Sequence, residues 1–152
     1  MKKVSTTQEL KTFWNSFQKD YTKIIEPNMQ SLFVLLFNSS NIIHPFNTNK
    51  NKKYILEPGC GGGAGLEFMC NELHKRNIEA DIYGTDISNN MLDYTFDRLK
   101  NTNYINIDFI DNKKINNNAK INLYLKEADN EKMPFEDNKF DMIIANLSLH
   151  LV

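Results

Sequence analysis

The sequence predicts an α/β fold in which a parallel sheet is covered by helices on both faces. Short apolar runs alternate with segments of helical periodicity from Tyr54 onward. This alternation favours parallel strands, because parallel neighbours need a crossover connection. Five of the six glycines are gathered between Gly59 and Gly65, directly after the first apolar run. A glycine-rich turn between a strand and a helix is typical of nucleotide-binding sites, because backbone N–H groups can approach a ligand there.

The first third of the chain is predicted to be helical. Apolar side chains recur at spacings of three and four, which indicates one apolar helix face; they are Leu10, Phe13, Trp14, Phe17, Tyr21, Ile24 and Ile25. Thr6 or Thr7 is a candidate N-cap, with Glu9 near the positive end of the helix. Pro27 is expected to interrupt the pattern, so that a second helix covers 29–37 and a linker covers 38–53.

The rest of the chain supplies the predicted strands and their helices. Strands are expected at 54–57, 81–86, 120–127 and 140–145, with a further short strand at 104–110 inside an irregular insertion over 101–119. Helices are expected at 64–76 and 89–100, and Ser88 is the predicted N-cap of the second. We therefore divide the chain into a helical cap or lid at 1–53 and a sheet domain at 54–152.

The last predicted strand lies close to the end of the sequence. A sheet built from these strands alone would leave that strand as an apolar edge, which is prone to pair with another chain. We therefore expect a fold that is incomplete at its C-terminus, with a protein partner as one means of completing the edge. Whether Val152 is the natural end of the protein stays open.

Composition and charge exclude several classes of protein. The chain has 152 residues, enough for one domain, and its formal net charge of −1 gives no general attraction to nucleic acid or an anionic membrane. The longest apolar run, 32–37, is too short to cross a bilayer. Cys60, Cys70 and three dispersed histidines have no metal-ligand spacing, so no metal is expected. The N-terminus lacks an apolar signal core, which predicts an intracellular, cytoplasmic protein and leaves a mitochondrial leader open.

Four ordered motifs resemble those of class I S-adenosylmethionine-dependent methyltransferases, in particular their type 11 methyltransferase domain. The motifs begin with Glu57-Pro-Gly-Cys-Gly-Gly-Gly63 and continue with Gly84-Thr-Asp-Ile-Ser88, Ala128-Asp-Asn-Glu-Lys-Met-Pro-Phe135 and the segment 140–150. Their order and spacing fit the family over about two-thirds of the chain. The resemblance implies a Rossmann-like sheet, S-adenosylmethionine as cofactor, and methyl transfer to an acceptor that the sequence does not identify.

The resemblance also implies a cofactor site. The set of residues that it places there is Tyr21, Glu57, Gly59, Cys60, Gly61, Gly63, Asp86, Ile87, Met91, Asp129, Asn130, Asn146 and Leu147. The glycine backbone would approach the methionine moiety, and Glu57 would order the loop and the amino end of the cofactor. Asp86 would accept hydrogen bonds from both ribose hydroxyls.

The remaining members of this set would bind the adenine and the sulfonium. Asp129 would accept from the adenine amino group, and the Asn130 N–H would meet a ring nitrogen. Ile87 would pack on the adenine together with Met133. Asn146 and Leu147 would lie beside the sulfonium methyl. Tyr21 would reach the cofactor from the helical segment, unless its aromatic stripe packs the helix onto the sheet instead.

Two other functions stay open at this point. Gly59, Gly61 and Ala64 also satisfy the G-x-G-x-x-A pattern of dinucleotide-binding enzymes, although Glu57 has no role in nicotinamide binding. A non-catalytic, methyltransferase-like subunit of a larger complex is the second alternative. His150 is a candidate general base, but a solvent-facing residue at a helix start is the interpretation we prefer, so no catalytic residue is named.

Overall fold

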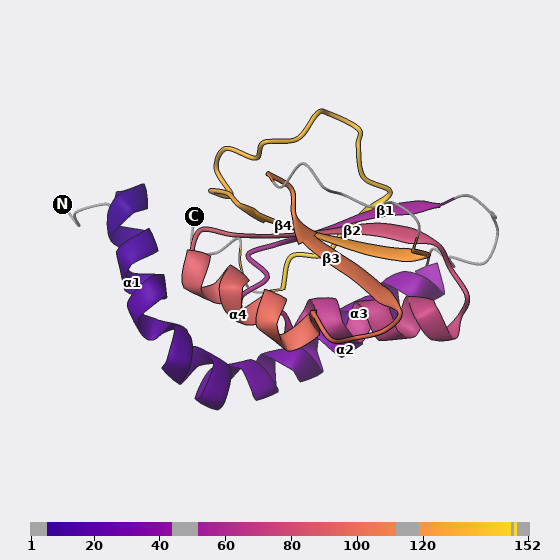
Figure 1. Cartoon of the computed structure of the whole chain (residues 1–152), viewed down its shortest axis with the longest axis horizontal. Helices are drawn as coiled ribbons and strands as arrows, with labels where there is room; N and C mark the ends of the chain where they lie inside the picture. Colours follow the sequence, from indigo (N-terminus) through magenta and orange to yellow (C-terminus); the bar gives the residue numbers. More distant parts are fainter. Residues whose placement is uncertain (1–5, 44–51, 112–118, 147, 149–152) are drawn as a thin grey trace.

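The computed structural model describes residues 6–43, 52–111, 119–146 and 148. Its N-terminal part is a bent helical arm made of α1 (Thr7–Asp20), a π-helical turn η1 (Tyr21–Ile25) and α2 (Glu26–Ile43) (Figure 1). The predicted cap of α1 is confirmed. The Glu9 N–H donates to Thr6 Oγ1 at 3.2 Å, and the Thr6 N–H donates to Glu9 Oε2 at 2.8 Å, which completes a capping box.

The sequence predicted that Pro27 would interrupt the helix, but the structure has a π-helical turn before Pro27 instead. The hydrogen-bond register changes over η1, and Pro27 lies in the first turn of α2, directly after that change. Helix α2 continues to Ile43, so the linker expected from residue 38 is helical at its start. Phe33 and Phe37 are buried against Phe68 of the next helix, and this packing outweighs the poor helix propensity of the residues after them.

A five-stranded parallel sheet forms the centre of the described structure, in the order β3-β4-β2-β1-β5. Its strands are β1 (Lys53–Pro58), β2 (Ala80–Asp86), β3 (Ile105–Phe109), β4 (Ile121–Glu127) and β5 (Met142–Ile143). The predicted strands are therefore confirmed, although β5 is shorter than expected. Helices α3 (Ala64–Lys75) and α4 (Asn89–Leu99) are confirmed as well, and Ser88 Oγ caps α4 by accepting the Met91 N–H.

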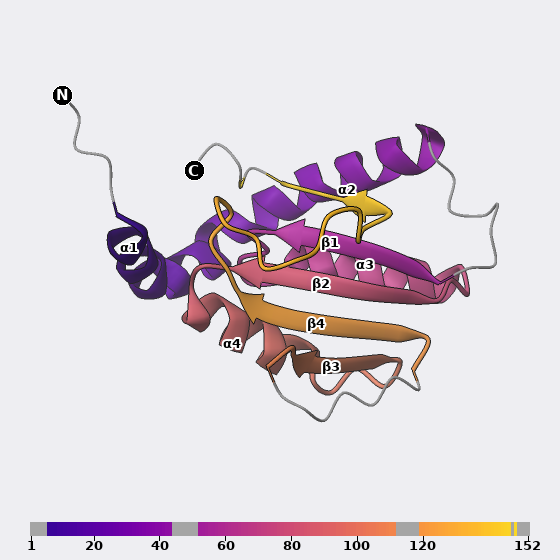
Figure 2. The same cartoon turned by 90° about the horizontal axis from the view of Figure 1, so that it is seen from above.

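The two faces of the sheet are covered differently, which corrects one expectation. Within the described residues α2, α3 and α4 lie on one face, where α3 and α4 pack on the strands and α2 packs on α3 (Figures 1 and 2). Ile82 and Leu123 belong to that core. The opposite face carries Tyr83 and Tyr124, and the segment 128–141 covers it with aromatic contacts instead of a helix. Strand residues alternate in direction, so one face is aliphatic and the other aromatic and polar.

Strand β5 lies at one edge of the sheet, beside β1, and Ile143 on it is 59% exposed. The apolar edge expected from the sequence is thus present over two paired positions. Within the described ranges, no helix combines the length and the apolar character that a membrane span needs.

Candidate functional site

The glycine loop joins the end of β1 to the start of α3. Gly59, Gly61 and Gly63 have φ values of 65°, 55° and 83°, a region that residues with a Cβ atom disfavour. The neighbouring side chains also leave no room for a Cβ atom at two of these positions. A Cβ atom at Gly61 would lie 3.1 Å from Tyr21 Cε1, and one at Gly63 would lie 2.5 Å from Thr95 Cγ2. The loop therefore needs glycine both for its backbone and for the close approach of its neighbours.

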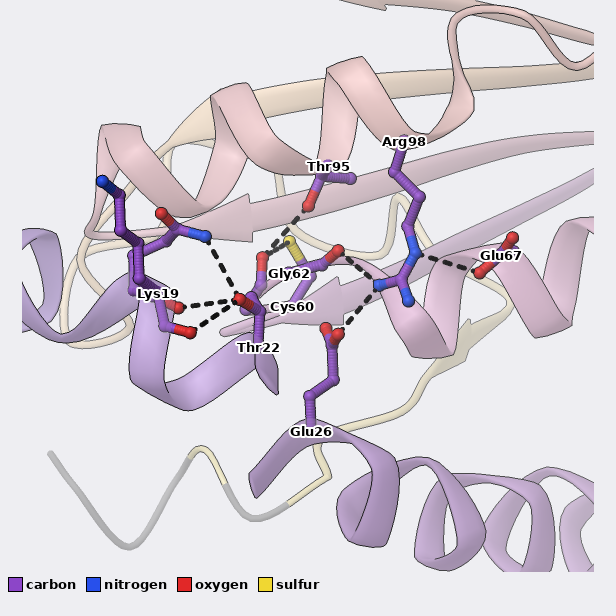
Figure 3. A network of polar contacts seen from close by, with 10 residues as sticks. Lys19, Thr22, Glu26, Cys60, Gly62, Glu67, Thr95 and Arg98 are labelled. Carbon is purple, nitrogen blue, oxygen red and sulfur yellow. Dashed lines mark hydrogen bonds and ion pairs between the residues drawn. The ribbon is translucent and has the colours of Figure 1, made fainter. Parts of the chain in front are cut away.

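Helix α4 holds the loop from one side. The Thr95 hydroxyl donates to the Gly61 carbonyl at 3.1 Å, and Arg98 Nη1 donates to the Gly62 carbonyl at 2.8 Å (Figure 3). In a trans peptide the C=O and the following N–H point in opposite directions. Two consecutive carbonyls fixed toward α4 therefore turn the Gly62 N–H away from that helix.

Asp86 ties the loop to the start of α4. The Gly61 N–H donates to Asp86 Oδ2 and the Ser88 N–H donates to Asp86 Oδ1, both at 2.9 Å. Burial raises the pKa of Asp86, while the N–H groups of Ser88, Gly61 and Ile87 oppose the rise. Each carboxylate oxygen keeps a second lone pair, so the expected ribose contact stays a prediction beside this structural role.

Acidic side chains are concentrated behind the loop. Glu57 at the end of β1 is 4% exposed and Glu26 at the start of α2 is 5% exposed. Burial, followed by the nearby carboxylates of Glu26 and Asp86, raises the pKa of Glu57 well above its ordinary value. Burial and the same acids also raise the pKa of the Cys60 thiol, which keeps it protonated and unreactive.

Several buried oxygens in the described residues have no hydrogen-bond partner. They are Glu26 Oε1, Glu57 Oε2, Thr85 Oγ1 and Ser148 Oγ. All four belong to residues in or beside the loop region: Thr85 accepts the Cys60 N–H at its carbonyl, and Ser148 Cβ lies 2.5 Å from the position of a Cβ at Gly59. A buried oxygen without a partner is costly, so this cluster suits a ligand that brings hydrogen-bond donors.

Helix α1 lies across the carboxyl ends of the strands. The Thr7 hydroxyl donates to Asp129 Oδ2 at 2.9 Å beyond β4, and Lys11 forms an ion pair with Glu127. Further along, Asn15 Oδ1 accepts the Ser88 hydroxyl at 2.7 Å. The arm therefore covers the end of the sheet at which β2 and β4 finish, and Figure 2 shows the strand arrows pointing toward α1.

The aromatic stripe of α1 does not enter the core. No residue of α1 is buried, and Phe13 is 53% exposed. The rings pack on one another instead, and Trp14 meets Tyr21 edge-on at 5.9 Å between centroids. The alternative that this stripe packs the helix onto the sheet is therefore wrong, because the rings pack on one another and α1 packs mainly on α4.

Most of the predicted site residues meet at the loop, and the others that the structure describes lie around it. Those that meet at the loop are Tyr21, Glu57, Gly59, Cys60, Gly61, Gly63, Asp86 and Asn130, whose Nδ2 lies 3.5 Å from a Cβ placed on Gly59. Asp129 accepts the Glu131 N–H in addition to Thr7, and Asn146 Nδ2 donates to the Met29 carbonyl of α2 at 2.9 Å. Ile87 is half-buried beside Asp86, and Met91 is buried in the first turn of α4.

Three further residues have predicted roles that the structure does not test. Met133 is half-buried in the segment that crosses the sheet, where its expected adenine contact stays a prediction. Leu147 and His150 lie outside the described residues. Their predicted roles are therefore not tested by the structure.

Sequence reasoning missed the residues of α4 that hold the loop. These residues, Thr95 and Arg98, lie three positions apart on the helix, and a threonine with poor helix propensity in mid-helix was the available signal. The spacing places these side chains on one face, but it does not reveal that this face meets the glycine loop. Asn15 was missed for the same reason, since its partners are more than seventy residues away.

A separate concavity of about 560 Å³ lies on the aromatic face of the sheet. Its lining includes Tyr83, Tyr124, Phe135 and Lys139 but no residue of the glycine loop. The Lys139 ammonium lies 4.4 Å from the centre of the Tyr83 ring, so a cation of the chain itself already contacts the aromatic wall. In the part of the chain that the structure describes, no group of three His, Cys, Asp or Glu side chains could hold a metal ion.

The fold and the loop together define a Rossmann-like domain with a glycine-rich loop at the carboxyl ends of parallel strands. The methyltransferase domain family matches residues 56–152, and the chain belongs to this family. The resemblance to class I S-adenosylmethionine-dependent methyltransferases and the Rossmann-like fold class are therefore confirmed.

Solved structures share the fold at low sequence identity. A putative S-adenosyl-L-methionine-dependent methyltransferase from Methanococcus maripaludis is 16% identical with a TM-score of 0.52, over 99% of this chain and 55% of that chain. Magnesium protoporphyrin IX methyltransferase from Synechocystis is 13% identical with a TM-score of 0.57, over 92% of this chain and 57% of that one.

Geranyl diphosphate C-methyltransferase from Streptomyces coelicolor is 12% identical with a TM-score of 0.59, over 96% of this chain and 55% of that one. The chain thus spans little more than half the length of these enzymes, which agrees with the expectation of an incomplete fold. No curated protein sequence matches it.

Proposed function

We propose that this chain forms the S-adenosylmethionine site of a methyltransferase that acts on an acceptor still to be identified. The observation that carries the proposal is the set of buried carboxylates and unpartnered oxygens around the glycine loop. S-adenosylmethionine brings an ammonium and a sulfonium, so its charge complements this site. The oxygens of Glu57 and Ser148 that have no partner in the chain would accept hydrogen bonds from its donors.

The charge of the site also separates this proposal from the dinucleotide alternative. Glu26, Glu57 and Asp86 are buried beside the loop, and the nearby cation Arg98 already bonds acceptors of the protein. A dinucleotide would bring its negatively charged pyrophosphate to this place, where the carboxylates would repel it. A cationic cofactor would instead reduce the repulsion among the acids.

The chain's own residues would mainly bind and orient. The bound cofactor supplies an already activated methyl group, so no nucleophile of the protein is required. Asp86 would use its remaining lone pairs for the ribose, and Asp129 with Asn130 would recognise the adenine. Tyr21 would close the site from above the loop. Residues that select and activate the acceptor are not assigned.

Calorimetric titration of the full chain with S-adenosylmethionine and S-adenosylhomocysteine tests this proposal, with NAD as the control ligand. We expect micromolar binding of the first two and none of NAD. Tight NAD binding would favour the dinucleotide alternative. A folded chain that binds none of the three would overturn the proposal and favour the non-catalytic subunit.

A further inference from the structure

The side chain of Arg98 joins three parts of the chain. Its Nη1 donates to Glu26 Oε2 at 2.9 Å and to the Gly62 carbonyl at 2.8 Å, and its Nε pairs with Glu67 Oε2 at 3.1 Å. These acceptors belong to the start of α2, the glycine loop and the first turn of α3. Figure 3 shows the guanidinium between them.

The chemistry of this contact requires arginine. A guanidinium presents five donors in a planar fork, whereas a lysine ammonium is a compact point charge and cannot span the same acceptors. Glu26 is nearly inaccessible to water, so losing its cationic partner would leave a buried carboxylate uncompensated. Packing is tight here too, since a Cβ at Gly62 would lie 2.5 Å from Glu26 Oε1.

Glu26 connects this contact to the arm. Its N–H closes the π-helical turn by donating to the carbonyl of Tyr21, whose ring lies against Gly61. Thr95, one turn before Arg98 on α4, holds the Gly61 carbonyl. Both sides of the contact between arm and loop, Glu26 on the arm and Gly61 on the loop, are therefore held by side chains on the same face of α4.

We propose that Arg98 is a positioning residue that couples the helical arm to the glycine loop. By fixing Glu26 and Gly62 together, it sets the place of Tyr21 over the loop and the direction of the loop's peptide groups. The part of this inference that concerns ligand affinity rests on the proposed function; the coupling of arm and loop does not.

Hydrogen exchange of the full chain without ligand tests the coupling directly, on the variant Arg98→Met. Arg76→Met is the matched control, because Arg76 also pairs with a glutamate of α3, Glu72, and its side chain is similarly exposed, at 29% against 25%. We expect faster exchange in both 21–27 and 59–65 for Arg98→Met and unchanged exchange there for Arg76→Met. Exchange that rises in only one segment, or equally in both variants, would overturn the coupling.

Arg98→Lys keeps the charge and provides a second variant in case the methionine variant does not fold. We expect faster exchange in the same two segments, because one ammonium cannot hold all three acceptors. Wild-type exchange in Arg98→Lys would show that charge alone suffices and would overturn the role of the guanidinium.

Titration with S-adenosylhomocysteine then measures the consequence for the site. We expect about tenfold weaker binding by Arg98→Met, within the range typical of coupling between sites, and no change in Arg76→Met. If the wild-type chain itself does not bind, the proposed function fails while the exchange result still decides the coupling. Wild-type affinity in Arg98→Met with altered exchange would overturn the link from Arg98 to the cofactor.

Discussion

The ring of Tyr21 lies against the backbone of Gly61, so close that a Cβ added there would be 3.1 Å from Cε1. Burial, followed by the carboxylates of Glu26, Asp86 and Glu57, raises the pKa of Tyr21 to about 12. The phenol therefore stays neutral at physiological pH and can donate a hydrogen bond without adding to the negative charge of the site. Arm and loop are thus in contact through a π-helical turn, a feature often found at functional sites.

Gly61→Ala should disturb this contact. A non-glycine residue at the positive φ of Gly61 costs about 1–2 kcal/mol, and the methyl group would also push the Tyr21 ring away. We expect a lower free energy of unfolding, measured by denaturant titration, and weaker binding of S-adenosylhomocysteine. Asn138→Ala, at a φ of 60° outside the loop, is the control for backbone strain and should leave binding unchanged. Equal affinities of Gly61→Ala and the wild type would contradict the tight approach.

Thr95→Val should loosen the loop without changing the volume of the side chain. The Gly61 carbonyl would lose its buried donor, which costs about 1–3 kcal/mol. Thr95→Ser keeps the hydroxyl and should lose less. Chemical unfolding of both variants provides the comparison, and a serine variant as unstable as the valine variant would indicate that the methyl group matters instead.

Glu57→Gln should affect stability and binding in opposite directions. The native pKa of Glu57 is raised above its ordinary value of 4.5, so the native state prefers the proton. Its contribution to stability is therefore fully present below pH 4.5 and is lost as the pH rises through the native pKa. We expect the glutamine variant to unfold at a higher temperature than the wild type at pH 8, with the difference shrinking toward pH 4.5.

The same variant should bind S-adenosylhomocysteine more weakly, because a neutral amide attracts the ligand's ammonium less than a carboxylate does. Thermal scans across this pH range and titrations at pH 8 check both parts. A glutamine variant that is destabilised at pH 8 would argue that Glu57 is held ionised in the native protein.

Asp86→Ala should weaken cofactor binding, since a ribose hydroxyl pair would lose its acceptor and the loop would lose its contact to α4. Asp81→Ala provides the control on the same strand. Asp81 is also buried, but it lies at the opposite end of β2 from Asp86 and pairs with Lys52 and Asn122. Calorimetry under conditions where both variants are folded should find a loss for Asp86→Ala alone, and unchanged affinity there would refute the ribose assignment.

The exposed edge at β5 leads us to expect self-association of the chain. Ile143→Lys should reduce it, because charge on an edge strand opposes pairing with another strand. Leu35→Lys on the exposed side of α2 is the matched control and should have little effect. Light scattering measures the outcome, and a monodisperse wild-type monomer would speak against the edge as an interface.

Local signals in the sequence were sufficient for the sheet and for the loop. The cap at Ser88 and the glycines after β1 follow from backbone requirements that single residues reveal. The course of the arm could not be predicted in this way, because the contacts of Thr7 and Asn15 join residues far apart in the chain. The contacts of Arg98 could not be predicted either, because a charged residue on a helix is ordinarily solvated.

The buried acids behind the loop have a consequence for the lifetime of the protein in a cell. Glu57 makes the ligand-free fold less stable near neutral pH than a neutral residue would in its place, because burial and the carboxylates of Glu26 and Asp86 raise its pKa. A bound cation relieves that repulsion, and any ligand that binds only the native state raises the folded population with its concentration. Chains deprived of cofactor would unfold more often and be degraded sooner, so the abundance of this protein would follow the metabolic supply of its cofactor.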